Sequence, residues 1–300
     1  MTPFLDARAT TRALAPLALV RSLEALLADP AVQVPERLVQ PLPGGGSLFV
    51  MPALDGRIAI TKLITFTPAN AGTPRPAIQG DVVVFDAATG TRTLVLDGPA
   101  VTAQRTAAVS LLAAQRLAPV PDGPLLIVGA GAQGLSHLEA FQAGLPVREV
   151  RVASRSRASA ERLAQRAREL GLTALVVDDP DRALADCPLV VTCTPASGVV
   201  LRSRPRDDAF IAAVGAFTPA MVELGPELCR HCAQRGRIVL DTPDAVHEAG
   251  DLIQAGLDLA ALASLRDVVQ GRVPSGGGPV LFKSCGWAGW DLAAARCATG

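Results

Sequence analysis

Three glycines in the middle of the chain have the spacing of a phosphate-binding turn. An apolar run at 125–128 leads into Gly129, Gly131 and Gly134, and a predicted helix follows at 135–145. Gly129 would permit a tight turn, Gly131 would let backbone approach a pyrophosphate, and Gly134 would let the helix pack closely on the strand. The phosphates would then face free N–H groups at the start of the helix. This segment therefore predicts a dinucleotide site.

The end of the next predicted strand bears on which dinucleotide binds. A carboxylate about 20 residues after the glycines would bind the ribose 2′-hydroxyl of NAD. Ser154 stands at that position, followed by Arg155 and Arg157. A hydroxyl and two guanidinium groups suit a 2′-phosphate instead, so these residues predict NADPH, with NADH as the alternative. A solvated helix start in an arginine-rich chain would look the same.

Two isolated basic residues upstream of the turn could bind an anionic substrate. Arg105 lies near the start of a predicted helix, 102–117, and Lys62 lies in a predicted strand, 57–66. A guanidinium group can hold a carboxylate through two parallel hydrogen bonds. A surface arginine and a solvent-facing lysine remain open alternatives. Of the 28 basic residues only Lys62 and Lys283 are lysines.

The composition indicates a globular protein without a nucleic-acid or membrane partner. The chain has 300 residues, of which 49% are hydrophobic, so it can form one large or two ordinary domains. Its 28 basic and 28 acidic residues balance, and no basic run favours nucleic acid. No window reaches about 18 uninterrupted apolar residues, and no signal peptide is evident. We expect a soluble, cytoplasmic protein.

Cysteine and tyrosine usage narrows the chemistry. The six cysteines, mostly at apolar positions, are typical of reduced core thiols. Cys229 and Cys232 have C-x-x-C spacing, but a structural zinc needs two more ligands, so we expect no metal. The chain has no tyrosine, which excludes the tyrosine-dependent acid chemistry of many Rossmann reductases.

The second half of the chain alternates short apolar runs with amphipathic segments, as βαβ units require. The predicted strands are 125–129, 149–154, 174–178, 189–194, 210–215 and 237–241. They predict a doubly wound parallel sheet of the Rossmann type, in an α/β domain over residues 119–278.

The first part of the chain predicts a mostly antiparallel sheet beside a helix at 12–28. The predicted strands are 47–51, 57–66, 81–86 and 93–97, with hairpin turns at 54–56 and 88–90. Linkers are predicted at 119–124 and 274–279, and a strand at 280–284 and a last helix from Ala288 follow. We expect this tail to return to the first domain, so an α+β substrate-binding and dimerisation domain would comprise 1–118 and 279–300.

The order of several short motifs resembles the ornithine cyclodeaminase and mu-crystallin family over nearly the whole chain. These are Thr61-Lys62, the run 102–108 around Arg105, the glycine turn, Glu223-Leu224 after Pro219, and Phe282-Lys-Ser284 followed by Asp291-Leu292. The resemblance implies a homodimer in which Arg37, Lys62 and Arg105 bind the substrate, with Lys62 and Arg105 catalytic. It also implies cofactor contacts at Ala132, Gln133, Ser154, Thr194, Val214, Gly215 and Ser284.

One departure from the family pattern bears on the activity. Ornithine cyclodeaminases usually carry an aspartate, with a proton-handling role, where this chain has Phe217. A phenyl ring cannot perform the proton transfers of deamination and ring closure. Reduction of a cyclic imine needs less: a carboxylate anchor, a protonated nitrogen and a hydride donor within about 3.5 Å of the imine carbon. Phe217 could line an apolar pocket for the ring methylenes, or merely pack the loop.

The Gly-Ala-Phe-Thr-Pro segment resembles family members that reduce Δ1-pyrroline-2-carboxylate and Δ1-piperideine-2-carboxylate to L-proline and L-pipecolate. We therefore expect an NADPH-dependent cyclic ketimine reductase. Ornithine cyclodeaminase activity, alanine dehydrogenase activity, and a non-catalytic protein of the mu-crystallin kind that binds NADPH and a small ligand are the alternatives. The proton donor is not fixed by the sequence.

Overall fold

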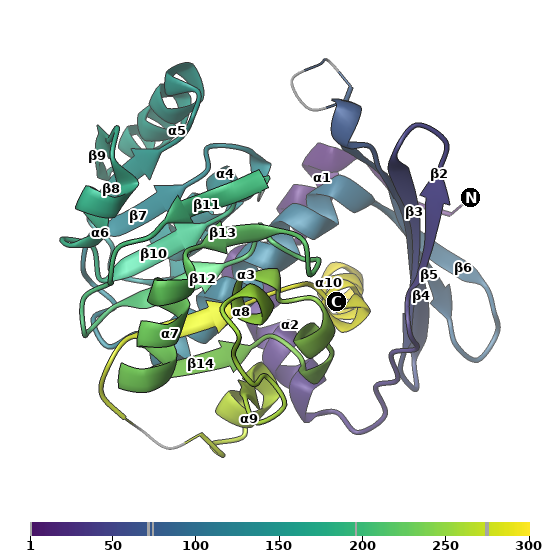
Figure 1. Cartoon of the computed structure of the whole chain (residues 1–300). Coiled ribbons are helices and arrows are strands. Elements are labelled where there is room, and N and C mark those ends of the chain that lie inside the picture. Colours follow the sequence, from purple (N-terminus) through teal and green to yellow (C-terminus); the bar gives the residue numbers. More distant parts are fainter. Residues whose placement is uncertain (1, 71–72, 74, 196, 274–275) are drawn as a thin grey trace. The chain divides into compact units, whose positions relative to one another are not determined.

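The chain forms two compact units in the computed structural model, which describes residues 2–70, 73, 75–195, 197–273 and 276–300. Unit 1 comprises Met1–Arg105 and Trp287–Gly300, and unit 2 comprises Thr106–Gly286. Each unit has a main sheet of its own (Figure 1).

The sheet of unit 2 is built from eight parallel strands in the order β15-β14-β16-β12-β10-β7-β8-β9. These strands are β7 (Leu125–Val128), β8 (Glu149–Ala153), β9 (Thr173–Val176), β10 (Leu189–Thr192), β12 (Phe210–Ala213), β14 (Arg237–Leu240), β15 (Ala263–Ser264) and β16 (Val280–Lys283). All four residues of β7, β10, β12 and β16 are buried, as expected of central strands covered on both faces. This sheet confirms the predicted doubly wound parallel fold.

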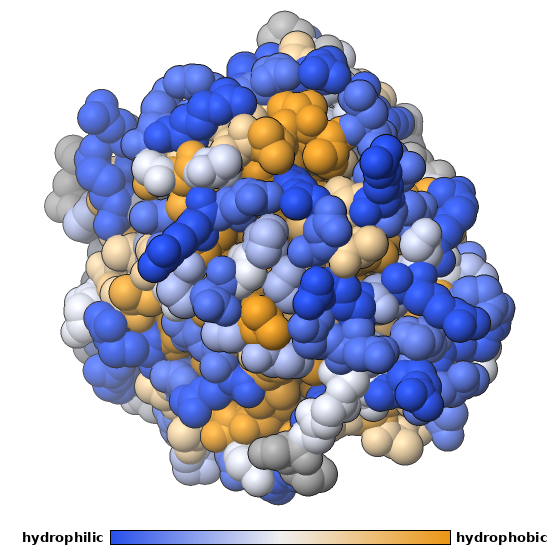
Figure 2. All heavy atoms as spheres, turned by 90° about the vertical axis from the view of Figure 1, so that its left-hand side faces the viewer, coloured by the Kyte–Doolittle hydropathy of each residue, from blue (hydrophilic) through white to orange (hydrophobic). Residues whose placement is uncertain are grey.

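The remaining elements of unit 2 are mostly helices between the strands. They are α4 (Ala132–Gly144), α5 (Arg157–Glu169), α6 (Pro180–Leu184), α7 (Pro226–Arg235), η2 (Pro243–His247), α8 (Gly250–Gln254) and α9 (Leu265–Val269). A small second sheet pairs β11 (Ser197–Leu201) with β13 (Val222–Leu224). On the side of the molecule shown in Figure 2, hydrophilic side chains cover most of the surface and apolar side chains form separate patches.

Unit 1 contains the predicted antiparallel sheet, in the order β1-β6-β5-β4-β3-β2. Its strands are β1 (Phe4–Leu5), β2 (Leu38–Leu42), β3 (Gly46–Leu54), β4 (Ile58–Phe66), β5 (Ile78–Asp86) and β6 (Arg92–Asp97), with a 3-10 turn η1 at Pro68–Asn70. All neighbours pair antiparallel except β1 with β6. The two predicted hairpin turns join β3 to β4 and β5 to β6.

The C-terminal helix covers one face of this sheet. The helix α10 (Ala288–Thr299) packs on β3 and β4 and lies beside α2 (Pro16–Ala28) (Figure 1). Leu19, Leu23 and Leu26 recur on one side of α2 at helical spacing and are fully buried. Arg296 of α10 pairs with Asp29 at 2.6 Å and also with Asp55, and thereby ties the C-terminal helix to the first half of unit 1.

The structure corrects several predicted elements. The helix predicted at 12–28 is two helices, α1 (Ala7–Ala13) and α2, because Pro16 cannot continue a helix but suits the first turn of a new one. The strands β1 and β2 have no counterpart among the predictions. The helix predicted at 102–117 begins four residues earlier, as α3 (Gly98–Leu117).

The bounds of the two units differ from the predicted domain boundaries at 118/119 and 278/279. The helix α3 is continuous across Arg105 and Thr106, where the two units divide. The predicted strand at 280–284 is β16, which pairs with β12 and β14 and lies in unit 2. Within the linker predicted at 274–279, residues 274 and 275 lie outside the described residues. No helix among the described residues is long and apolar enough to cross a membrane.

Candidate functional site

The glycine turn of unit 2 has a geometry that only glycines fit at two positions. Gly129 has φ +118°, and a Cβ there would lie 2.7 Å from the carbonyl oxygen of Cys193. A Cβ on Gly134 would collide with the carbonyl oxygen of Gly129, so the helix α4 approaches the turn closely. At Gly131 a Cβ would meet nothing within 4 Å. Open space at Gly131 leaves room for a ligand beside the start of α4.

The first residues of α4 follow this open position. Gly131 is the N-cap residue of the helix and provides no side-chain hydrogen bond to its first N–H groups. Ala132 is exposed and Gln133 is half-buried. The N-terminus of a 13-residue helix with an open approach can hold phosphate groups.

The strand β10 lies beside β7, and the residue that follows β10 supports the glycine turn at the end of β7. The Cys193 thiol donates to the carbonyl oxygen of Gly129 at 3.2 Å. Burial raises the pKa of this thiol well above its usual range, so it stays protonated. Cys193 therefore acts as a hydrogen-bond donor that fixes the turn.

The residues predicted to select the cofactor lie just after β8. Ser154 Oγ accepts from the Ser156 N–H at 3.3 Å, and Ser156 caps α5. Arg155 is exposed. Arg157 is already paired with Asp178 at 3.0 Å and with Glu161 at 3.4 Å. Arg155 is therefore the better placed of the two arginines to bind a phosphate.

A buried carboxylate joins the ends of β10 and β12, close to the predicted cofactor residues Thr194 and Gly215. Glu223 Oε1 accepts from the Thr194 N–H at 2.6 Å and from the Thr194 hydroxyl at 2.8 Å. Glu223 Oε2 accepts from the Gly215 N–H at 2.7 Å and from the Thr192 hydroxyl at 3.1 Å. Val214, the other predicted residue here, is half-buried, and its N–H donates to Thr192 O.

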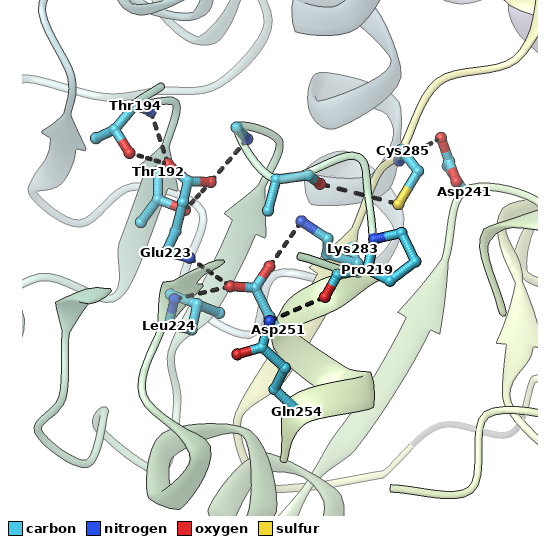
Figure 3. A network of polar contacts seen from close by, with 12 residues as sticks. Thr192, Thr194, Pro219, Glu223, Leu224, Asp241, Asp251, Gln254, Lys283 and Cys285 are labelled. Atoms are coloured by element: carbon cyan, nitrogen blue, oxygen red, sulfur yellow. Dashed lines mark hydrogen bonds and ion pairs between the residues drawn. The ribbon is translucent and has the colours of Figure 1, made fainter. Parts of the chain in front are cut away.

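A second carboxylate supports Glu223 from α8. Asp251 Oδ1 accepts from the N–H groups of Glu223 and Leu224, and Asp251 Oδ2 lies 2.8 Å from Lys283 Nζ (Figure 3). Burial disfavours the Lys283 ammonium, but the carboxylates of Asp251 and Glu223 raise its pKa. Burial raises the pKa of Glu223, whereas Lys283 and the hydrogen bonds from Thr194 oppose this shift.

Two further predicted residues lie near this network. Ser284 follows β16, is buried, and donates its hydroxyl to Asp241 Oδ2 at 2.8 Å. Phe217 is half-buried and packs against the hydrophobic core of unit 2. The structure thus gives Phe217 a packing role in its loop.

Unit 1 brings two of the three predicted substrate-binding residues, Lys62 and Arg105, to a carboxylate that sequence reasoning did not assign. Lys62 Nζ lies 2.7 Å from Asp291 Oδ2, and Arg105 Nε lies 3.4 Å from Asp291 Oδ1. Lys62 and Asp291 are at most 1% exposed. Lys62 shares the buried face of β4 with Ile60 and Ile64, the face on which α10 packs. The lysine is therefore directed at α10.

The electrostatics of this cluster favour an anion. Burial lowers the pKa of Lys62 to about 8; Asp291 opposes this shift, whereas Arg105 and Arg37 add to it. Arg37 is half-buried, and its charge acts on Lys62. Lys62 and Arg105 face one carboxylate, so these two side chains carry more positive charge than Asp291 balances and can bind a carboxylate ligand.

Sequence reasoning missed the roles of Asp291, Glu223 and Asp251. A signal existed for two of them, because Asp291 stands between Trp290 and Leu292 and Glu223 stands between Val222 and Leu224. A lone carboxylate inside a buried apolar run requires a partner. The partners themselves lie far away in the sequence.

The C-x-x-C pair lies on α7, where both thiols are buried. Burial raises the pKa of Cys232 to about 12 and that of Cys229 further still. Among the described residues no group of three or more His, Cys, Asp or Glu side chains could hold a metal ion.

The fold and the two clusters define a Rossmann-type protein with a second, cation-bearing α+β unit. The chain belongs to the ornithine cyclodeaminase/mu-crystallin family, whose model matches residues 14–299. It is 41% identical to Delta(1)-pyrroline-2-carboxylate reductase 1 of Burkholderia multivorans, over 99% of this chain and 95% of that protein. The Delta(1)-pyrroline-2-carboxylate/Delta(1)-piperideine-2-carboxylate reductase of Azospirillum brasilense is 39% identical, over 99% and 94%. An archaeal alanine dehydrogenase dimer with bound NAD has the same fold, with a TM-score of 0.89 and 23% identity over 99% and 94% of the two chains.

Proposed function

We propose that this protein reduces cyclic imino acids with NADPH, converting Δ1-pyrroline-2-carboxylate, Δ1-piperideine-2-carboxylate or both to L-proline and L-pipecolate. The observation that carries the proposal is the buried pair of Lys62 and Arg105 at Asp291, with the charge of Arg37 also acting on Lys62; this positive charge suits a carboxylate substrate. The names of the Burkholderia and Azospirillum relatives support the same substrates.

The basic residues of unit 1 divide two tasks between them in this reaction. Arg105 and Arg37 bind the substrate carboxylate. Lys62, with a pKa of about 8, holds a proton at Nζ near neutral pH and can deliver it to the imine nitrogen. A bound nicotinamide dinucleotide supplies hydride to the imine carbon, so that hydride and proton together convert C=N to CH–NH.

Phe217 supports reduction over cyclodeamination. Its loop follows β12 in unit 2, and its side chain packs on the core of that unit. The phenyl ring offers no group for the extra proton transfers that loss of ammonia and ring closure would require. A carboxylate at this position would have favoured cyclodeamination.

The preference for NADPH rests on the segment after β8. Ser154 and Arg155 provide a hydroxyl and an exposed guanidinium where NAD-binding proteins have a carboxylate. Arg157 contributes less, because Asp178 and Glu161 already engage it. Pyrophosphate contacts are proposed at Gly131, Ala132 and Gln133.

We also propose a cytoplasmic homodimer. The face of the unit 1 sheet opposite α10 carries the exposed apolar side chains Phe4, Leu38 and Leu63, which are 60%, 58% and 45% exposed. Leu38 and Leu63 flank Val50 in one row across three neighbouring strands, and such an apolar row suits a subunit interface. Replacing Leu63 with Glu should yield monomers in light-scattering measurements, and an unchanged mass would contradict this interface. The six free cysteines agree with a reducing compartment.

A pair of arginine variants tests the substrate site. Arg105→Leu should raise the KM for the cyclic imine about a hundredfold, since bidentate charge-assisted bonds are the strong class, and should leave the Kd for NADPH unchanged. Arg116→Leu, on the exposed part of the same helix, is the matched control. Equal kinetics for the two variants would remove Arg105 from the site.

A further inference from the structure

Glu223 is buried with its charge, yet it lies outside the cluster that we propose to bind the substrate. Each of its two carboxylate oxygens faces one backbone N–H, that of Thr194 at 2.6 Å and that of Gly215 at 2.7 Å. A backbone N–H can only donate, so both oxygens must accept. Both oxygens thus act as acceptors, and the carboxylate spans two different strand ends.

The strand that bears Glu223 is held in turn by an ion pair. Asp251 accepts from the backbone N–H groups of Glu223 and Leu224, and its other oxygen pairs with Lys283, which is fully buried. Figure 3 shows the Lys283 side chain directed at Asp251 and the Glu223 carboxylate directed at Thr192 and Thr194. Two charges, Asp251 of α8 and Lys283 of β16, thus hold the strand β13, whose Glu223 carboxylate lies at the ends of β10 and β12.

The network of Glu223, Asp251 and Lys283 lies at strand ends where a ligand can bind. In doubly wound sheets, ligands bind outside the carboxyl ends of the strands, where the strand order reverses. That reversal lies at β7, whose neighbour β10 pairs in turn with β12. Gly215 has no room for a Cβ, which would lie 2.5 Å from a Glu223 carboxylate oxygen. The backbone here is therefore fitted closely to Glu223.

The same network fixes the loop that carries Phe217. The loop begins at Gly215, whose N–H is bound by Glu223, and its Pro219 carbonyl accepts from Gln254 Nε2 at 2.9 Å. A Cβ on Gly250 would lie 3.0 Å from the Pro219 carbonyl oxygen, so α8 packs tightly against the loop. Both ends of the loop are thus attached to the network or to the helix that bears Asp251.

We propose that Glu223 is a positioning residue: its carboxylate, held by Asp251 and Lys283, sets the ends of β10 and β12 in the conformation that binds the dinucleotide. This role of Glu223 depends on the proposed function in one respect only, that NADPH is the dinucleotide that binds. Glu223 contacts Thr194 and Gly215, and acts on the cofactor through them.

Glu223→Gln is the direct test, because an amide nitrogen cannot accept from the Thr194 or Gly215 N–H. The Kd for NADPH, measured by titrating NADPH fluorescence without substrate, should rise about tenfold or more, since bonds to a charged acceptor are strong. The KM for the cyclic imine should change less than about twofold, because the substrate cluster keeps its groups. Glu227→Gln, an exposed carboxylate on α7, is the matched control.

A purely structural role would give a different result. A lower unfolding temperature for Glu223→Gln with an unchanged Kd for NADPH would overturn the proposal. Should that variant fail to fold, Thr192→Val removes only the 3.1 Å hydroxyl bond to Glu223 and should still raise the Kd about two- to fivefold; an unchanged Kd would again overturn it. Wild-type protein that binds NADPH but reduces no imine would refute the proposed activity and leave this test intact.

Discussion

Replacing Asp291 with Asn should move the pH dependence of the reaction, because Asp291 sets the charge of Lys62. The carboxylate lies 2.7 Å from Lys62 Nζ, and both groups are buried. Burial, Arg105 and Arg37 all lower the pKa of Lys62, and Asp291 is the neighbour that keeps it as high as about 8. An opposite charge at this range shifts a pKa by about 1–3 units. In the variant the pKa of Lys62 should therefore fall to roughly 5–7.

The expected loss of activity follows from the protonated fraction of Lys62. With a pKa of about 8, about three quarters of the lysine is protonated at pH 7.5, whereas a pKa of 7 or lower leaves about a quarter or less. If protonated Lys62 is the proton donor, kcat/KM at pH 7.5 should fall at least about threefold. The alkaline limb of the pH profile should move from about pH 8 to about pH 5–7.

The assay is kcat/KM for the cyclic imine, measured at saturating NADPH from acidic to alkaline pH. Asp207→Asn, which removes an exposed carboxylate from unit 2, controls for a general change in net charge. An alkaline limb that stays at the wild-type pH in Asp291→Asn would refute the coupling between Asp291 and Lys62. A uniform loss at all pH values would show that Asp291 only maintains the fold.

Two further predictions concern unit 2. Arg155→Ala should raise the KM for NADPH about tenfold and leave the KM for NADH unchanged, since the guanidinium is proposed to bind only the 2′-phosphate; equal effects on both cofactors would contradict that role. Burial lowers the pKa of His137 to about 4, and its Nδ1 and Nε2 bond to Gln133 O and Ser110. Because the unfolded histidine takes up a proton below pH 6.5 and the folded one does not, the free energy of unfolding should fall by roughly 3 kcal/mol as the pH drops from 6.5 to 4. The free energy of unfolding of His137→Gln, measured by urea denaturation, should not show this fall with pH. If the free energy of unfolding depended on pH equally in both proteins, this role of His137 would be contradicted.

The architecture could be predicted because it rests on local patterns. Continuous apolar runs such as 125–128 and 189–192 became the central strands, and the turns at 54–56 and 88–90 became hairpins. The edge strand β2 was missed because four of its five residues are exposed and it contains Pro41, so no burial pattern marks it. The place of β16 depends on pairing between strands that are distant in the sequence, which no local pattern encodes.

The candidate site was only partly predictable for the same reason. The motifs gave Lys62 and Arg105, but Asp291 lies more than 180 residues beyond either one. The two lysines of an arginine-rich chain prove to be alike: each is buried and paired with one aspartate, Lys62 with Asp291 and Lys283 with Asp251. The rarity of lysine marked these two residues as unusual. Their roles could be inferred only once the structure showed the aspartates that pair with them.

The most direct test of the central claim is the oxidation of NADPH by purified protein with Δ1-pyrroline-2-carboxylate and, separately, with Δ1-piperideine-2-carboxylate. We expect NADPH to be consumed with at least one of them and L-proline or L-pipecolate to form in equal amount. Ammonia release from L-ornithine, with no NADPH consumed by either imine, would contradict it.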